Sequence, residues 1–354
     1  MHIPDSVIGP GGRRPFAMAG RMWELAIPLR KPFANAAITV DERRVVIVSI
    51  TGDGNIGWGE AAPYPGVTPD TADDAWETLQ RGSVLSPSAA AAIDEAAADL
   101  RARRDGMPMW ESIGGSLRPI ATSLAVGLDE DPVARLEATG AAGVKLKIRP
   151  GDDVARVAAT RSDLPEVLIG VDANGSYRWE DRGALLELDG FGVDYIEQPF
   201  AADDLASHAR LRDEMVAAVA LDETIDSEAA AIRAIEAGAC DLLVVKPSRV
   251  GLAASRAIHD IALAAGLRIK ASGLLETEIG RASTLAVATL PAATRSDIAP
   301  SSWYLAGGVG GVEHDSASDS IVPSNHPGIG FTPDPKAFAP FVVREAPISL
   351  RPEA

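Results

Sequence analysis

Charged residues recur at nearly constant intervals through the middle of the chain, each at the end of an apolar run of strand length. They are Lys147, Asp172, Glu197, Asp222 and Lys246, spaced 24 or 25 residues apart. Carboxylates bind hard divalent cations, and a lysine whose pKa is lowered can take a proton. The series therefore holds the residue types of a metal-assisted acid/base site.

Lysine is scarce in this chain, which makes its positions informative. The 33 lysines and arginines include only six lysines, namely Lys31, Lys145, Lys147, Lys246, Lys270 and Lys336. Arginine suits salt bridges, but only lysine can readily become a neutral base. Lys145 and Lys147 stand two apart on a predicted strand and so share one face, where repulsion and burial would lower a lysine pKa from about 10.4 toward about 7, a change worth roughly 4 to 5 kcal/mol. The alternative is a solvated charge pair at a strand edge.

The three acids of the series, Asp172, Glu197 and Asp222, would repel one another at a shared site unless a cation lay between them. A donor set of oxygens without histidine or cysteine favours Mg²⁺, or Mn²⁺, over Zn²⁺. Such an ion beside a substrate carboxylate stabilises the enediolate that forms when a base removes the α-proton. The alternative is that each acid caps the helix that follows it.

The interval also predicts the fold that brings these side chains together. About 25 residues accommodate one strand, one crossover helix and two loops, the repeating unit of a parallel sheet. Apolar residues at helical spacing predict helices at 203–214, 228–237 and 253–265. Continuing the interval reaches Ser272 and Asp297, and a strand at 120–126 in front gives about eight strands, enough to close a barrel. The strand ends would then converge at the carboxyl mouth of the barrel.

The first third of the chain lacks this interval and predicts a separate α+β domain. Its expected elements are strands at 22–28, 45–51 and 56–60 and a helix from Ser86 to about Arg104. We therefore expect a capping domain at residues 1–117, a barrel at 118–321, and a tail at 322–354 that returns to the first domain. Two irregular stretches, 29–38 and 61–71, are either lids over the mouth or ordinary surface loops.

Composition narrows the classes of partner. A net charge of −17 over 354 residues argues against binding to nucleic acid or to anionic membranes. We expect neither a signal peptide in residues 1–20 nor a membrane span, because no run approaches about 18 apolar residues. The single cysteine, Cys240, excludes an intrachain disulfide and suits a reducing cytoplasm. It is either a core residue or a nucleophile.

Six motifs together resemble the muconate lactonizing subgroup of the enolase superfamily, and within it the o-succinylbenzoate synthase / N-acylamino acid racemase family. The resemblance runs from about Leu25 to Pro333. The motifs are Lys145-Leu146-Lys147, Asp172-Ala173-Asn174, Glu197-Gln198-Pro199, Asp222-Glu223-Thr224, Lys246 to Gly251 and Leu275 to Arg281.

This resemblance implies a capping domain over a modified TIM-type (β/α)7β barrel. It implies that Asp172, Glu197 and Asp222 hold Mg²⁺, that Lys147 is the general base with Lys145 as its pKa-lowering neighbour, and that Lys246 acts from the opposite face of the substrate. The substrate would be a small anionic carboxylate, and homo-oligomers are common in the superfamily. Residues implied to bind the substrate are Asn174, Arg249, Ser272 and Gly273.

Several activities are compatible with the resemblance. In a synthase, Lys147 would remove the proton α to the carboxylate of 2-succinyl-6-hydroxy-2,4-cyclohexadiene-1-carboxylate and then protonate the departing hydroxyl, while the charge of Lys246 would stabilise the intermediate. The product, o-succinylbenzoate, serves menaquinone biosynthesis. In an N-succinylamino acid racemase, the two lysines would exchange roles. Arg249 resembles the pattern of members with racemase capability, although it could simply pair with a nearby acid. Another cycloisomerase, an acid-sugar-type lyase and a non-catalytic barrel are the further alternatives.

The chain departs from the family pattern at three positions, where Leu252, Ser272 and Glu278 replace glycine or another small residue. Ser272 would narrow or polarise the place of the far end of the substrate. At the eighth strand, Ser296-Asp297-Ile298 lacks an Asp-x-Asp pair, which speaks against a dipeptide epimerase. Lys270 is expected to have a structural role. None of the five histidines ends a predicted strand, which disfavours the mandelate racemase subgroup with its histidine-based dyad.

Overall fold

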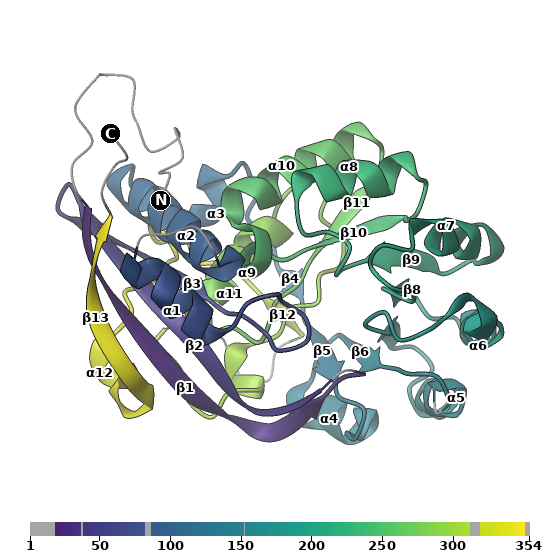
Figure 1. Cartoon of the computed structure of the whole chain (residues 1–354). Helices are drawn as coiled ribbons and strands as arrows, with labels where there is room; N and C mark the ends of the chain where they lie inside the picture. The colour runs from purple at the N-terminus through teal and green to yellow at the C-terminus, as the bar shows by residue number, and fades with distance from the viewer. Residues whose placement is uncertain (1–17, 37, 82–85, 152, 312–318, 351–354) are drawn as a thin grey trace.

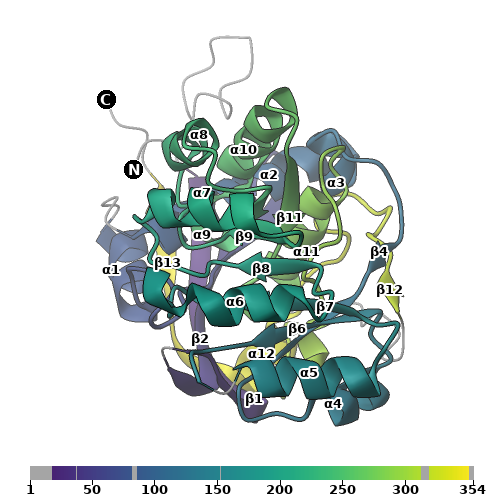
Figure 2. The same cartoon turned by 90° about the vertical axis from the view of Figure 1, so that its right-hand side faces the viewer.

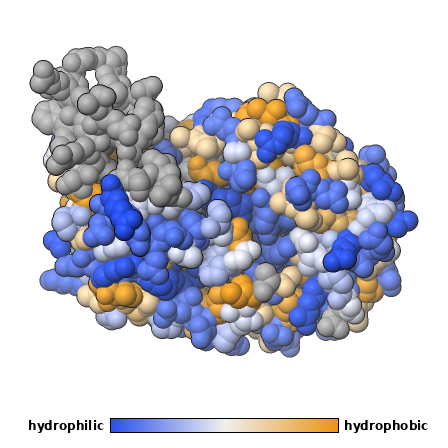
Figure 3. Space-filling view, viewed as in Figure 1, coloured by the Kyte–Doolittle hydropathy of each residue, from blue (hydrophilic) through white to orange (hydrophobic). Residues whose placement is uncertain are grey.

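The structure, a computed structural model, describes residues 18–36, 38–81, 86–151, 153–311 and 319–350. Figure 1 shows two parts side by side, one built on long antiparallel strands and the other on a curled parallel sheet surrounded by helices. The stretch at 1–20, where no signal peptide is expected, lies almost wholly outside the described residues. No helix within those residues is long and apolar enough to cross a membrane. The face seen in Figure 3 is largely hydrophilic, with scattered hydrophobic residues.

The antiparallel sheet has the order β13-β1-β2-β3. Its strands are β1 (Met18–Ala34), β2 (Thr39–Gly52), β3 (Asn55–Ala61) and β13 (Val342–Leu350). The hairpin expected between 45–51 and 56–60 is confirmed, and Asp53 and Gly54 turn it with φ of 49° and 77°. The expectation of an irregular stretch at 29–38 is wrong in part, because β1 continues to Ala34 and Phe33 pairs with Val40. A register shift between Pro28 and Phe33 lets the strand pass a proline, which has no N–H to donate.

Two helices cover one face of this sheet, α1 (Ala72–Arg81) and α2 (Pro87–Arg104). The predicted start of α2 is confirmed, since the Ser86 hydroxyl accepts from Ala89 N at 3.1 Å. The helix approaches β3 so closely that a Cβ at Gly57 or Gly59 would lie about 2 Å from a helix carbonyl. Glycine is therefore required at these two strand positions.

The parallel sheet has seven strands in the order β11-β10-β9-β8-β7-β6-β5. The strands are β5 (Ser123–Val126), β6 (Gly143–Lys147), β7 (Leu168–Asp172), β8 (Tyr195–Glu197), β9 (Ala218–Leu221), β10 (Leu242–Val245) and β11 (Arg268–Ala271). Helices follow them on the outer face (Figure 2). These are α4 (Pro132–Thr139), α5 (Asp153–Asp163), α6 (Arg182–Asp189), α7 (Leu205–Glu214), α8 (Glu228–Glu236), α10 (Leu252–Ala264) and α11 (Glu278–Ala288). The predicted alternation of strand and helix is confirmed.

The eighth strand is not regular, which corrects the prediction. The segment after α11 forms only two isolated parallel bridges, Ile269 to Ala293 and Ser272 to Asp297. Between them the Ser296 hydroxyl, instead of a backbone carbonyl, accepts from Ala271 N at 3.3 Å. The segment still closes the ring, since Ser123 N of β5 donates to Ile298 O at 2.9 Å.

Shorter elements join the two parts. They are α3 (Met109–Ser112), β4 (Ile120–Ala121), which pairs with β12 (Ser320–Ile321), α9 (Pro247–Val250) and α12 (Pro335–Phe338). From there β13 runs antiparallel to β1, so a segment that follows the barrel in sequence forms an edge of the N-terminal sheet.

Buried acids lie where the two parts meet. Glu60 on β3 accepts from Thr277 N at 2.9 Å, from the Thr277 hydroxyl at 2.6 Å and from Gly280 N at 3.0 Å, all at the start of α11. Glu95 on α2 accepts from Glu60 N at 3.3 Å, and Glu276 precedes α11. All three glutamates are fully buried. We call Glu60, Glu95 and Glu276 the interface acids.

Candidate active site

The strand-end charges of the barrel form one row at the carboxyl ends of adjacent strands. Lys147 is the cross-strand partner of Asp172, and Asp172 that of Glu197. Glu197 pairs with Ala220, and Asp222 directly follows β9, two residues beyond Ala220. The structure therefore brings the predicted acids and Lys147 together at the barrel mouth.

The amines and carboxylates of this row form close ion pairs. Lys147 Nζ lies 2.7 Å from Asp172 Oδ2 and 2.8 Å from Asn174 Oδ1. Lys246 follows β10 and places its Nζ 2.6 Å from Asp222 Oδ2. Both lysines are less than a tenth exposed. Lys145, the other member of the pair considered in the sequence, is also buried, so the alternative of a solvated charge pair at Lys145 and Lys147 is wrong.

Lys145 lies on the same face of β6 as Lys147. Its Nζ lies 2.9 Å from Glu197 Oε1, 3.1 Å from Asp172 Oδ2 and 3.3 Å from Asp297 Oδ2. Burial alone would lower its pKa, but the surrounding carboxylates outweigh burial and raise the pKa well above the usual value. The expectation that repulsion and burial lower the pKa of the paired lysines is thus wrong for Lys145, because three acids surround it.

The cations decide which acids stay charged. Burial raises the pKa of Asp172, but its two neighbouring lysines outweigh burial and lower it. At Asp222, Arg249 and Lys246 overcome the same effect and bring the pKa to about 2. Burial raises the pKa of Glu197 well above its usual value. The neighbouring carboxylates add to this rise, and Lys145 does not offset it.

Arg249 reaches Asp222 from the short helix α9. Pro247 starts this helix directly after Lys246, and the turn carries the guanidinium back over the mouth. Its Nη1 lies 3.0 Å from Asp222 Oδ1 and donates to the Asp222 carbonyl at 2.7 Å. The pairing with a nearby acid that the sequence left open is therefore present.

Asn174 is held in an unusual backbone conformation, with φ of 45°. Its Nδ2 donates to Glu223 Oε1 at 2.8 Å, while its Oδ1 accepts from Lys147. Gln198, after the next strand, has φ of 40°. Left-handed conformations at residues other than glycine cost free energy, and they often mark functional sites.

The capping domain contributes to the wall of the mouth. A cavity of about 70 Å³ is lined by Phe33, Asn35 and Tyr64 from the N-terminal part, together with Lys145, Lys147, Lys246, Ser272 and Gly273 from the barrel. Tyr64 is buried beneath the Arg43 guanidinium, 4.7 Å from its ring centroid, and its hydroxyl has no hydrogen-bond partner within the described ranges. Both stretches considered as lids therefore supply residues to the cavity.

Sequence reasoning assigned no role to Asp297, although the interval reached it. Its Oδ1 accepts from Tyr195 Oη at 2.7 Å and lies 3.3 Å from Lys270 Nζ. Lys270 also donates to Arg295 O at 2.8 Å, which agrees with the structural role expected for it. Burial raises the pKa of the Cys240 thiol to about 12, so a core role fits this cysteine better than a nucleophilic one.

The metal prediction can be tested against the donor atoms. Among the described residues, no three aspartate, glutamate, histidine or cysteine side chains form a metal-ligand cluster. The acids of the mouth pair with lysines instead. The chemistry of the donors still fits a hard cation. Asp172, Glu197 and Asp222 are at most 1 % exposed, and Glu197 Oε2 has no hydrogen-bond partner in the part of the chain that the structure describes.

Comparison with known families gives two matches. Residues 129–337 match the model described as enolase C-terminal domain-like. Residues 66–114 match the model of the mandelate racemase / muconate lactonizing enzyme N-terminal domain.

Individual relatives give the same result. The chain is 35 % identical over 315 residues to an o-succinylbenzoate synthase of Bacillus subtilis, a match that covers 80 % of this chain and 85 % of that protein. It is 37 % identical over 227 residues to an N-succinylamino acid racemase of Thermus thermophilus, covering 62 % of each. A dipeptide epimerase from Cytophaga hutchinsonii, crystallised with Mg and a dipeptide, superposes with a TM-score of 0.84 at 20 % identity, covering 94 % of this chain and all of that one. At that identity the last comparison concerns the fold alone.

Proposed function

Because the chain belongs to the enolase superfamily, in the mandelate racemase / muconate lactonizing enzyme subgroup, we propose that it is a Mg²⁺-dependent o-succinylbenzoate synthase. It would dehydrate 2-succinyl-6-hydroxy-2,4-cyclohexadiene-1-carboxylate in menaquinone biosynthesis. The observation that carries the proposal is the row of three buried acids flanked by Lys147 and Lys246 at one barrel mouth.

Asp172, Glu197 and Asp222 would hold Mg²⁺, or Mn²⁺ in its place. When bound, the ion supplies positive charge beside the substrate carboxylate as the α-proton leaves. The partly unpaired oxygens of Glu197 support this assignment.

The lysines would carry the proton chemistry. Lys147 Nζ would take the α-proton and then give it to the departing hydroxyl, so that water and the aromatic product result. Lys145 is placed two residues away with a raised pKa, so it stays positively charged beside Lys147. The ammonium of Lys246 would face the developing negative charge from the other side of the mouth.

The cavity would bind the rest of the substrate. Asn174, which holds Lys147 at 2.8 Å, would orient this base. Ser272 and Gly273 line the cavity and would contact the succinyl end, with Tyr64 above it. The cavity wall carries Lys145, Lys147, Lys246 and Arg281 with Asp297 as its one acid among the described residues, and this lining favours a small anionic carboxylate.

An N-succinylamino acid racemase is the second candidate, and Arg249 favours it. Paired with Asp222, Arg249 lies beside Lys246, the lysine that would have to act as an acid or base on the second face. The relative from Thermus thermophilus carries that name. Another cycloisomerase or an acid-sugar-type lyase of the superfamily is the further alternative.

One experiment separates these candidates. The purified protein, with Mg²⁺ in D₂O, receives the cyclohexadiene substrate and an N-succinylamino acid in separate reactions, followed by absorbance and by α-proton NMR. Rapid dehydration with slow α-proton exchange is the expected result. Fast exchange with little dehydration would make the protein a racemase.

A variant of Lys246 tests whether α-proton exchange of the N-succinylamino acid uses both lysines. Lys246→Met should abolish α-proton exchange from one enantiomer of the amino acid while exchange from the other survives, because each lysine serves one face. If Lys147→Ala kept both the dehydration and the α-proton exchange, both candidate functions would be contradicted.

Three further proposals accompany this function. The chain would divide into a capping domain at 1–117 with the tail 322–354, and a barrel at 118–321. We also propose a cytoplasmic location, on the ground of the single, buried cysteine. A homo-oligomeric state stays a prediction, which sedimentation would test.

A further inference from the structure

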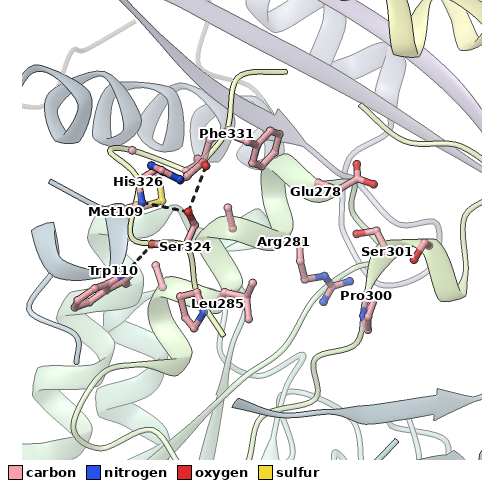
Figure 4. A pocket seen from close by; sticks show the side chains of 17 residues that line it. Met109, Trp110, Glu278, Arg281, Leu285, Pro300, Ser301, Ser324, His326 and Phe331 are labelled. Carbon is pink, nitrogen blue, oxygen red and sulfur yellow. Dashed lines mark hydrogen bonds between the residues drawn. The ribbon is translucent and has the colours of Figure 1, made fainter. Parts of the chain in front are cut away.

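A second cavity, of about 300 Å³, lies between α3, α11 and the segment 323–331. Its wall includes the apolar side chains of Met109, Trp110, Leu285 and Phe331, with Ser324 and His326 beside Met109 and Trp110 (Figure 4). A volume of this size is at the lower end of the range for small-molecule sites. Hydrogen bonds hold the wall in place, since Trp110 Nε1 donates to Ser324 O at 2.9 Å. The cavity is therefore preformed.

Polar groups gather at the other end of this cavity. Figure 4 shows Glu278, Arg281 and Ser301 on the side away from Trp110 and Met109. Arg281 is 6 % exposed and Ser301 is 4 % exposed. Neither Arg281 Nε nor Ser301 Oγ has a hydrogen-bond partner among the described residues, although both atoms are buried. Buried donors without partners cost free energy, so a ligand that accepts from them would bind favourably.

The charges at this end are not balanced by the protein. Arg281 Nη1 lies 3.4 Å from Glu276 Oε1, so one carboxylate already neutralises the guanidinium. Glu278, one of the departures from the family pattern, adds a second carboxylate and is held through Oε2 by Val309 N at 3.0 Å. The polar end thus has two unpaired donors beside one surplus negative charge.

We propose that this cavity binds an apolar α-amino acid in its zwitterionic form. The ligand carboxylate accepts from Arg281 Nε and Ser301 Oγ, its ammonium group pairs with Glu278, and its side chain packs against Trp110 and Leu285. A simple anion would meet the surplus charge of Glu278, and a simple cation would leave both buried donors unpaired. This inference does not rest on the proposed reaction.

Arg281 also lines the cavity at the barrel mouth. The two cavities therefore share one side chain, and a ligand in the second cavity would contact the wall of the candidate active site. The binding test below is independent of any turnover.

The first test compares three ligands that differ only in their head group. Phenylalanine, phenylalanine amide and N-acetylphenylalanine are titrated by calorimetry into the full-length protein with Mg²⁺. The zwitterion should bind at least about tenfold more tightly than either derivative, the loss expected for one charge-assisted contact. Equal or tighter binding of the N-acetyl anion that persists in Asp222→Asn, where the barrel mouth is impaired, or no binding of phenylalanine, would overturn the proposal.

Variants then place the site. Ser301→Ala should weaken phenylalanine binding about tenfold, whereas Ser255→Ala should not, because the Ser255 hydroxyl is equally buried but already donates to Gly251 O at 2.6 Å. Ala282→Leu, from the cavity wall, should abolish binding by filling the space. Asp222→Asn should leave binding unchanged, and loss of binding in that variant would place the ligand at the barrel mouth and overturn the proposal. Circular dichroism confirms that each variant is folded, and Ser301→Ala alone decides the matter if Ala282→Leu is not.

Discussion

Asp222 at the barrel mouth and Glu60 at the interface are equally buried but differ in their partners. At the mouth, Asp222 lies within 3.0 Å of Lys246 and Arg249, and its pKa falls to about 2. At the interface, Glu60 accepts mainly from backbone N–H groups and a hydroxyl, and burial raises its pKa to about 7. Burial, reinforced by the charge of Glu60, also raises the pKa of Glu95 well above its usual value.

This difference shows that burial alone does not determine whether an acid is ionised. An acid whose neighbouring cations outweigh burial stays ionised and can bind a metal ion or a cationic group, as at Asp222 and at the interface acid Glu276 beside Arg281. At Glu197 the one neighbouring lysine, Lys145, does not offset burial, and the pKa rises. An acid held by neutral donors between two parts of a protein keeps a proton near neutral pH and serves mainly to join them. The four predictions below test this division.

The largest expected effect separates the two groups by activity. Asp222→Asn should lower kcat/KM by at least about 1000-fold, roughly 4 kcal/mol, because it removes a proposed metal ligand and the charge opposite Lys246. Glu60→Gln should lower it less than tenfold. Steady-state assays with Mg²⁺ measure both, and a similar loss in the two variants would contradict the division.

The second prediction concerns stability against pH. The pKa of Glu60 is raised above its unfolded value, so the native state holds a proton that the unfolded chain has lost. The free energy of unfolding should therefore fall as pH rises from about 4.5 to about 7, with a contribution from Glu60 of about 3 kcal/mol. Below pH 4.5 this contribution is fully present.

Urea unfolding between pH 5 and 8 measures this dependence. Glu60→Gln cannot ionise, so its curve should be flatter than that of the parent protein in this window. Glu345→Gln, an exposed glutamate on β13, is the control and should leave the slope unchanged. An unchanged slope in Glu60→Gln would show that Glu60 titrates normally.

The third prediction is stabilisation by the metal ion. At about 100 times its dissociation constant, Mg²⁺ should add about 2.7 kcal/mol to the free energy of unfolding, since its proposed ligands come together only in the folded mouth. Thermal unfolding at matched ionic strength, with EDTA as the metal-free reference, measures the rise in Tm. Glu60→Gln should show the full rise and Asp222→Asn none, and the reverse pattern would place the metal at the interface.

The smallest effect concerns one hydroxyl at the interface. Thr277→Ala should cost about 1 kcal/mol of stability, because Glu60 loses a 2.6 Å hydrogen bond and α11 loses its N-terminal cap. Thr277→Ser keeps the hydroxyl and should cost only a few tenths of that. Equal losses in chemical denaturation would mean that the methyl group, and not the hydrogen bond, matters.

Much of the mouth could be predicted from the sequence because its residues end consecutive strands. A fixed interval between Lys147, Asp172 and Glu197 predicts that they lie in one row, regardless of the conformation of the loops. In the structure, neighbouring members of this row are cross-strand partners. The same interval failed to give a regular eighth strand, since the Ser296 side chain takes the place of a backbone acceptor there. A periodic sequence pattern cannot show where a side chain replaces a backbone hydrogen-bond acceptor.

The interface acids had no comparable signal. Glu60 stands between Gly59 and Ala61 at the end of a predicted strand, and Glu95 lies in an alanine-rich helix where an acid is ordinarily exposed. Their burial depends on contact between β3, α2 and α11, which come from distant parts of the chain. The second cavity and the raised pKa of Lys145 likewise depend on packing that no local pattern encodes.

The position of β13 has a consequence for how the protein is made. The N-terminal sheet takes its edge strand from residues that leave the ribosome after all seven barrel strands. During synthesis, β1 therefore has an open edge until the barrel has been translated, and this edge is available for mispairing. The seven barrel strands can therefore pair before the N-terminal sheet has received its edge strand, β13.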